Sequence, residues 1–116
     1  MELTIHDQLN SDDLFEAFKT QLAKDFEQSN FSSAFVGTLS PDFALIREQI
    51  VRELQRTEKH VDSNLMQLLY RVDIGEGQLK KYLGQSTNEN HLTSIAELII
   101  KRVLQKVVIK KYYGRR

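Results

Sequence analysis

The sequence has no cysteine, one proline, five glycines and no net charge over 116 residues. Without cysteine the chain has no disulfide, no thiol nucleophile and no thiolate metal ligand, and it suits a reducing compartment. So few prolines and glycines favour long helices over a series of short strands. No apolar run is long enough to span a bilayer, and the acidic N-terminus has no signal-peptide core. We therefore expect a soluble, cytoplasmic protein with no membrane partner.

The length and the apolar content of 41% fit a single globular domain over residues 1–116. Residues 1–10 are ambiguous: Leu3, Ile5 and Leu9 either dock this segment or leave it as a flexible arm.

Charge is unevenly distributed along the chain. Residues 1–30 hold seven acidic residues against two lysines, and residues 91–116 hold seven basic residues against Glu97. The basic end could attract nucleic acid, or the two ends could face each other within one chain or between subunits. We favour internal complementarity, because a non-specific nucleic-acid binder usually has a net positive charge.

Two helices are predicted from local signals near the ends of the chain. Ser11 is a predicted N-cap, and apolar residues at helical spacing extend the helix over 11–29. In 29–40 the Ser, Gly and Asn content predicts a loop, with Phe31 and Phe35 against the core. A very broad apolar face over 91–113 predicts a central helix, although VVIKKYY is also compatible with a strand.

The middle of the chain predicts one long helix over 41–72. Ser40-Pro41-Asp42 resembles a helix start, with Ser40 as the cap and Pro41 in the first helical position. Apolar residues then keep a single 3- or 4-residue phase from Phe43 to Val72 without glycine or proline. Asp62-Ser63-Asn64 could cap a new helix, but a break would normally shift this phase. A helix of this length would measure about 48 Å.

A short helix is predicted over 74–83. Asp73 and Glu76 have the spacing of a capping box, and Gly84 is a suitable C-terminal cap. The expected fold is thus all-α, an antiparallel bundle of three long helices and one short one. The predicted core is Phe15, Phe18, Leu22, Phe26, Ile46, Ile50, Leu54, Leu65, Leu68, Leu79, Ile95, Ile99, Ile100, Val103 and Leu104.

No catalytic motif is present, so we expect a protein that is not an enzyme. His6, His60 and His91 lack metal-ligand spacing, and there is no nucleophile elbow and no phosphate-binding glycine pattern. No catalytic, metal-binding or cofactor-binding residue is predicted. The expected function is that of a helical protein-interaction module, whose partner is another protein or a second copy in a homodimer.

The alternative is a small nucleic-acid-binding protein that uses the basic C-terminal end and the corner over 73–83, where the long helix is followed by the short one. Its contact residues would be Gln78, Lys80, Lys81, Lys110, Lys111, Arg115 and Arg116. A helix-turn-helix is disfavoured because the apolar stripe before the corner is too long for its first helix. Its turn usually has a glycine where Asp73 stands and a small residue where Leu69 stands. Its base-facing positions would begin Gly75, Glu76, Gly77. The basic residues of KKYYGRR are also compatible with a solvent-exposed helix end that binds no nucleic acid.

The segments LLYRVDI (68–74) and AELIIKRVLQKVVIKKYY (96–113) resemble small uncharacterised helical bacterial proteins with a similar apolar final helix. The resemblance implies a bacterial, helical, cytoplasmic protein and identifies no functional residue.

Overall fold

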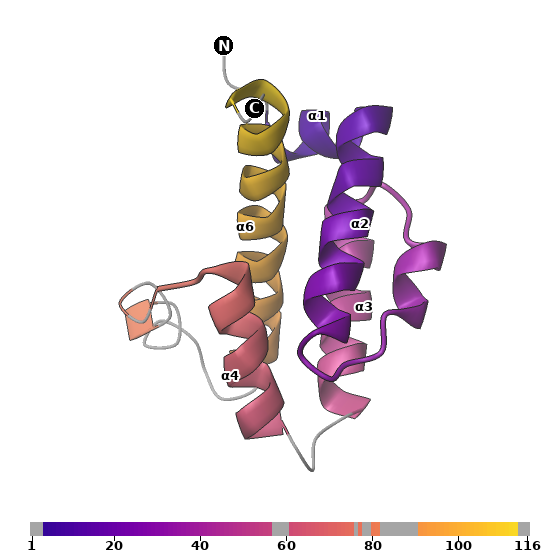
Figure 1. Cartoon of the computed structure of the whole chain (residues 1–116). Coiled ribbons are helices and arrows are strands. Elements are labelled where there is room, and N and C mark those ends of the chain that lie inside the picture. The colour runs from indigo at the N-terminus through magenta and orange to yellow at the C-terminus, as the bar shows by residue number, and fades with distance from the viewer. Residues whose placement is uncertain (1–3, 57–60, 76, 78–79, 82–90, 114–116) are drawn as a thin grey trace.

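The computed structural model describes residues 4–56, 61–75, 77, 80–81 and 91–113. In these residues all regular structure is helical, which confirms the all-α prediction (Figure 1). The elements are α1 (Ile5–Leu9), α2 (Asp12–Glu27), the 3₁₀ helix η1 (Ala34–Thr38), α3 (Phe43–Arg56), α4 (Val61–Val72) and α6 (His91–Tyr113).

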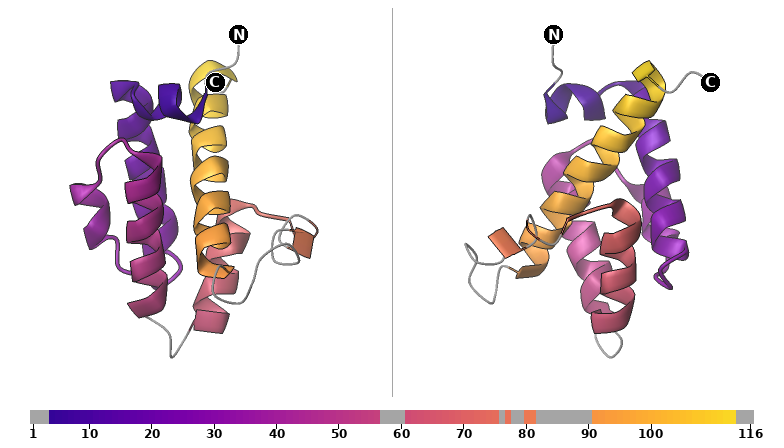
Figure 2. Two further views of the ribbon diagram at one scale, coloured as in Figure 1. Left: turned by 180° about the vertical axis from the view of Figure 1, so that it is seen from behind. Right: turned by 60° about the vertical axis from the view of Figure 1, so that its left-hand side comes forward.

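Helix α6 lies at the centre of the molecule and contacts α1, α2, α3 and α4. It runs opposite to α2 and α3, while α4 runs in the same sense as α6 (Figures 1 and 2). The predicted bounds of 91–113 are confirmed, and the strand alternative for VVIKKYY is wrong, because α6 stays helical through Tyr113. Its broad apolar face explains its central position, since each neighbouring helix covers a different part of that face. None of the described helices combines the length and apolarity that crossing a membrane requires.

The prediction of one continuous helix over 41–72 is wrong. Helix α3 ends at Arg56, α4 begins at Val61, and α4 runs back beside α3 (Figures 1 and 2). A straight helix of about 48 Å would exceed the longest dimension of the molecule, 38 Å. The apolar phase persists because α3 and α4 each turn one face to the same core. Periodicity therefore identifies the buried side of a helix but not whether the chain stays straight.

The helix starts agree with the sequence only in part. Ser11 caps α2 as predicted, since its Oγ accepts from the backbone N–H of Leu14. At α3 the predicted cap is misplaced: Asp42, not Ser40, accepts from Leu45 N through its Oδ1 at 3.0 Å. The carbonyl of Asp42 also accepts from Ile46 N, so Pro41 lies before the helix. Asp outcompetes Ser here because its carboxylate also interacts favourably with the helix dipole.

Helices α2 and α4 end in the same way, in Schellman motifs. Asn30 and Asp73 have φ angles of 68° and 67°. After α2, Phe31 N donates to Phe26 O and Asn30 N to Glu27 O; after α4, Ile74 N donates to Leu69 O and Asp73 N to Tyr70 O. These are the two bonds that define the motif.

The predicted capping box is therefore wrong in its first residue, because Asp73 ends α4 instead of starting the next helix. The Asp73 carboxylate pairs with Arg102 Nη2 of α6 at 2.7 Å. Glu76 and most of the predicted helix 74–83 lie outside the described residues. Residues 77, 80 and 81 are helical, whereas Ile74 and Gly75 are not, so the predicted start is too early.

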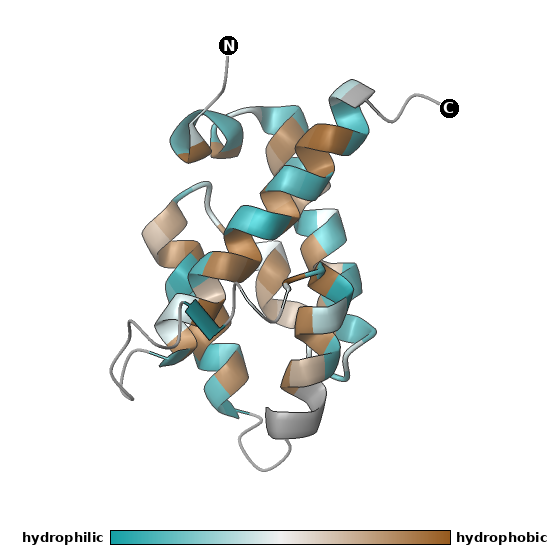
Figure 3. Ribbon diagram, turned by 90° about the vertical axis from the view of Figure 1, so that its left-hand side faces the viewer, coloured by the Kyte–Doolittle hydropathy of each residue, from teal (hydrophilic) through white to brown (hydrophobic). Residues whose placement is uncertain are grey.

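The core agrees closely with the sequence prediction. Of the fifteen predicted residues, twelve are buried, Phe15 and Leu65 are half-buried against the core, and Leu79 lies outside the described residues. Figure 3 shows why: apolar segments recur at about every turn of the long helices. Further buried apolar residues are Leu9, Leu14, Phe31, Val36, Leu39, Leu69, Val72, Ile74, Ala96, Leu98 and Val107.

The ambiguous N-terminal segment and the predicted loop after α2 both dock on this core. Leu9 of α1 is buried and Ile5 packs against the core, so the described part of residues 1–10 is a docked helix. Phe31 and Phe35 contact the ring of Phe26, with centroids 5.6 and 5.2 Å apart, as expected for the loop after α2. The 3₁₀ helix η1 in that loop was not predicted.

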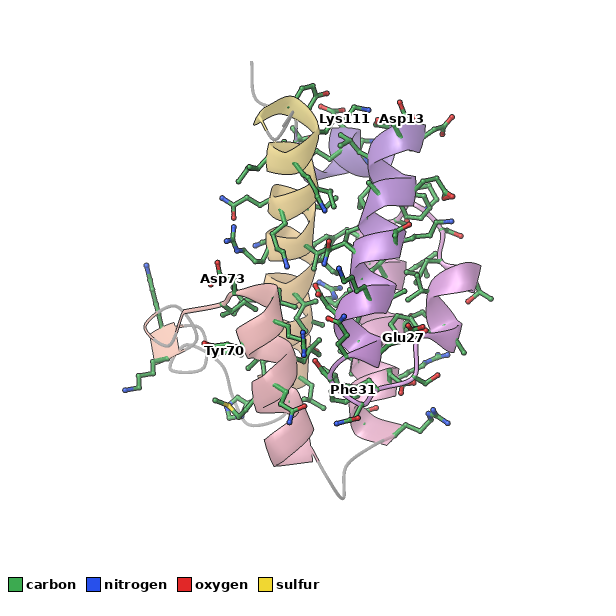
Figure 4. All side chains as sticks on the ribbon, in the orientation of Figure 1. Asp13, Glu27, Phe31, Tyr70, Asp73 and Lys111 are labelled. Atoms are coloured by element: carbon green, nitrogen blue, oxygen red, sulfur yellow. The ribbon has the colours of Figure 1, made fainter. Side chains whose placement is uncertain are left out.

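The acidic and basic ends of the sequence face each other along α2 and α6. Lys111 Nζ lies 3.1 Å from Asp13 Oδ2 (Figure 4), and Lys106 Nζ lies 3.5 Å from Asp25 Oδ2. Internal complementarity is therefore the correct interpretation of the charge pattern for these residues.

Candidate functional site

A groove of about 780 Å³ runs between α2 and α4. Each helix contributes one face to it, because residues three or four positions apart lie on the same side of a helix. The lining residues are Gln21, Lys24, Asp25 and Gln28 from α2, and Met66, Gln67, Tyr70 and Arg71 from α4.

The inner part of the groove is a polar junction of three helices. Asp25 is only 3% exposed, and its Oδ1 accepts a hydrogen bond from Gln21 Nε2 at 3.0 Å. Its counter-charge is Lys106 of α6, whose Nζ also donates to the carbonyl of Arg71 at 3.1 Å. The Asp25 charge is therefore paired within the fold, although its Oδ2 accepts no hydrogen bond from the described residues.

The outer part of the groove carries uncompensated positive charge. Arg71 Nη1 donates to Gln28 Oε1 at 2.8 Å, a bond from α4 to α2 that leaves the guanidinium charge unneutralised. Lys24 is exposed, and its side chain forms no hydrogen bond or ion pair with the described residues. Within the described chain, neither cation has a carboxylate partner.

Two large apolar side chains flank the groove on α4. Tyr70 is 86% exposed and Met66, one turn before it, is 55% exposed. Tyr70 projects from the α4 ribbon in Figure 4. A single exposed apolar residue needs no explanation, but two on one face of a helix beside a groove are of the kind found at interaction sites.

The described residues among those predicted to contact nucleic acid lie in two separate places. Lys80, Lys81, Lys110 and Lys111 are exposed, whereas Gln78, Arg115 and Arg116 lie outside the described residues. The segment with Lys80 and Lys81 lies beside the lower half of the molecule in Figure 1, and Lys110 and Lys111 lie at the opposite end, on the last turn of α6. Lys111 is also paired with Asp13.

Of the three sequence objections to a helix-turn-helix at the corner, one loses force and a second does so in part, because Leu69 still stands where a small residue is expected. Helix α4 has 12 residues, so the helix before the corner is short. Asp73 adopts the left-handed conformation that a glycine would supply in such a turn. The third objection stands: Gly75 and Gly77 would offer no side chains to base edges.

The groove residues were not singled out from the sequence. Asp25 was counted only as part of the acidic N-terminal segment. A signal for its burial does exist, since it follows Phe18 by seven positions and directly precedes Phe26. No comparable signal marks Tyr70, because its exposure depends on how α4 packs.

Searches for similar proteins find no matching family model, no matching curated protein and no matching solved structure. The function of the chain has to be inferred from the groove itself.

Proposed function

We propose that the chain is a non-enzymatic protein-interaction module that binds a partner protein on the helical face formed by α2 and α4. The groove brings together a tyrosine, a methionine and an arginine, residue types that are enriched at protein–protein interfaces.

The exposure of Tyr70 is the observation that carries this proposal. A tyrosine side chain has about 150–250 Å² to bury and only two side-chain torsions to order, so it contributes strongly when an interface covers it. In the free chain 86% of Tyr70 is in contact with solvent, and the packing of the fold does not use it. Burial of Tyr70 by a partner would therefore contribute almost entirely to the free energy of binding.

Affinity capture from cells of the native host, with cross-linking, tests the proposal. The baits are the full chain, Tyr70→Ala and Tyr112→Ala, because Tyr112 is also an exposed tyrosine, 53% accessible, on another helix. We expect partner proteins that bind the wild type and Tyr112→Ala but are lost with Tyr70→Ala. Partners retained equally by both variants would overturn the proposal, as would the absence of any reproducible partner together with a monomeric state by light scattering.

Nucleic-acid binding is the second candidate, favoured by the short α4 and by Lys80 and Lys81. Both lysines are exposed and without a carboxylate partner among the described residues. Titration of labelled duplex and single-stranded DNA and RNA at low salt tests it, because phosphate attraction is then greatest. Binding that Lys80→Glu with Lys81→Glu abolishes would support this candidate, and no binding at low salt would dispose of it.

A further inference from the structure

We infer that the α2–α4 groove binds an acidic amphipathic helix of a partner protein. Apolar side chains of that helix would cover Met66 and Tyr70, and its carboxylates would pair with Lys24 and Arg71. This inference rests on the proposed function and specifies the chemistry of the partner.

The groove suits a helix better than an extended segment. It lies between two helices, whose backbone groups are already hydrogen-bonded along their lengths, so an extended strand would find no sheet edge to join. From Gln21 to Gln28 the α2 side of the groove is about 10 Å long at 1.5 Å per residue. About two turns of a bound helix, with apolar residues at positions i, i+3 or i+4 and i+7, match this length.

The charges of the groove select carboxylates on that helix. The chain neutralises Lys106 with Asp25 and Lys111 with Asp13, but it supplies no carboxylate to Lys24 or Arg71 within the described residues. Asp25 is the one acidic residue among the described residues that line the groove, and it is already paired with Lys106. Acidic residues on the partner would therefore meet two unpaired cations, and basic residues would be repelled by both.

A second copy of the chain fits this groove poorly. Outside the groove, the exposed large apolar residues of the described chain are Leu45, Ile109 and Tyr112. Ile109 and Tyr112 flank Lys110, which would bring a third positive charge to Lys24 and Arg71. Near Leu45, the carboxylate of Glu48 is already paired with Arg52 at 2.6 Å, so it is not free to pair with Lys24 or Arg71 of another copy.

The probe for a test is a displayed library of alanine-based helical peptides with randomised outward-facing positions, selected against the full chain. We expect the selected peptides to combine a stripe of apolar residues with flanking Asp or Glu. Their Kd should rise tenfold or more with Lys24→Glu plus Arg71→Gln, and it should rise on going from 50 to 500 mM NaCl. Lys110→Glu is the matched control and should change the Kd less than twofold, because Lys110 is also an exposed lysine, lies at the end of α6 outside the groove lining and forms no ion pair with the described residues.

Lys24→Gln alone is a milder variant of an exposed residue that should leave the fold intact, as checked by circular dichroism, and weaken binding two- to fivefold. Selected peptides that are basic or uncharged, or that respond equally to Lys24→Glu and Lys110→Glu, would overturn the inference. So would an empty selection, competition by duplex DNA for the same site, or self-association that Tyr70→Ala abolishes.

Failure of the inference remains distinguishable from failure of the proposed function. Peptides that need Tyr70 but show no preference for acidic residues would contradict only the partner chemistry. Cellular partners lost with Tyr70→Ala would likewise leave the proposed function standing when the peptide selection fails. Partners indifferent to Tyr70 would remove the proposed function and, with it, the basis of the inference.

Discussion

Lys106 on α6 places its ammonium 3.5 Å from the buried carboxylate of Asp25 on α2. The same ammonium donates to the carbonyl of Arg71 on α4, so one side chain joins three helices. Lys106 therefore stabilises both the packing of these helices and the position of the two helices that form the candidate groove.

Breaking this pair from the lysine side should be costly. Lys106→Met leaves Asp25 charged, buried and without its counter-ion, and we expect a loss of about 1–3 kcal/mol of unfolding free energy, below the range for fully buried pairs because Lys106 is partly solvated. In a double-mutant cycle with Asp25→Asn, measured by urea denaturation, the coupling energy should be about 1–2 kcal/mol. Additive single effects would show that the two side chains do not interact in solution.

The left-handed conformation of Asn30 should make glycine preferable to alanine there. We expect Asn30→Gly to exceed Asn30→Ala in unfolding free energy by about 1 kcal/mol, because only alanine has a Cβ that crowds the backbone at positive φ. Asn10, with φ of −86°, is the control position. At Asn10 alanine should equal or exceed glycine, and the same order at both positions would contradict the Schellman assignment.

The start of α3 allows a direct comparison of Asp42 with Ser40. Asp42→Ala removes the acceptor for Leu45 N and should cost about 0.5–2 kcal/mol. Ser40→Ala should stay within about 0.5 kcal/mol of the wild type, because an exposed residue outside the helix makes little contribution. The midpoints of thermal and urea unfolding measure both, and a larger loss at Ser40 would restore the cap predicted from the sequence.

Two isoleucines of α6 test the depth of the core. Ile99 is fully buried and Ile109 is 45% exposed. Ile99→Val should cost about 0.5–1.5 kcal/mol through the lost methyl group and the cavity it leaves. The same substitution at Ile109 should change the unfolding free energy by less than about 0.5 kcal/mol. Equal effects would mean that α6 does not turn its Ile99 face to the core.

Local signals were reliable wherever the decisive contacts are close in sequence. The Ser11 cap, the bounds of α6 and most core positions follow from residues within a few turns of one another. The signals failed where two local choices were compatible. Asp42 and Ser40 are both good caps, and Asp73 can start a helix or end one. In the structure Asp73 ends a helix, Ile74 and Leu69 pack in the core, and Arg102 pairs with the Asp73 carboxylate.

The candidate groove could not be predicted from the sequence for the same reason. Its two faces, from α2 and α4, come from segments about 40 residues apart, and they meet only because the chain does not continue straight from α3 into α4. Nothing in the sequence around Arg71 or Gln28 indicates that their side chains form a hydrogen bond.

The sequence by itself determined an all-helical chain, the buried side of each helix and the opposite charges of its two ends, because helical periodicity and capping act over a few residues. Only the tertiary structure decided that α4 folds back beside α3, that Asp25 is paired with Lys106, and that Tyr70 stays exposed beside a groove. These features depend on packing between distant segments, where the burial of the whole apolar surface outweighs any local preference.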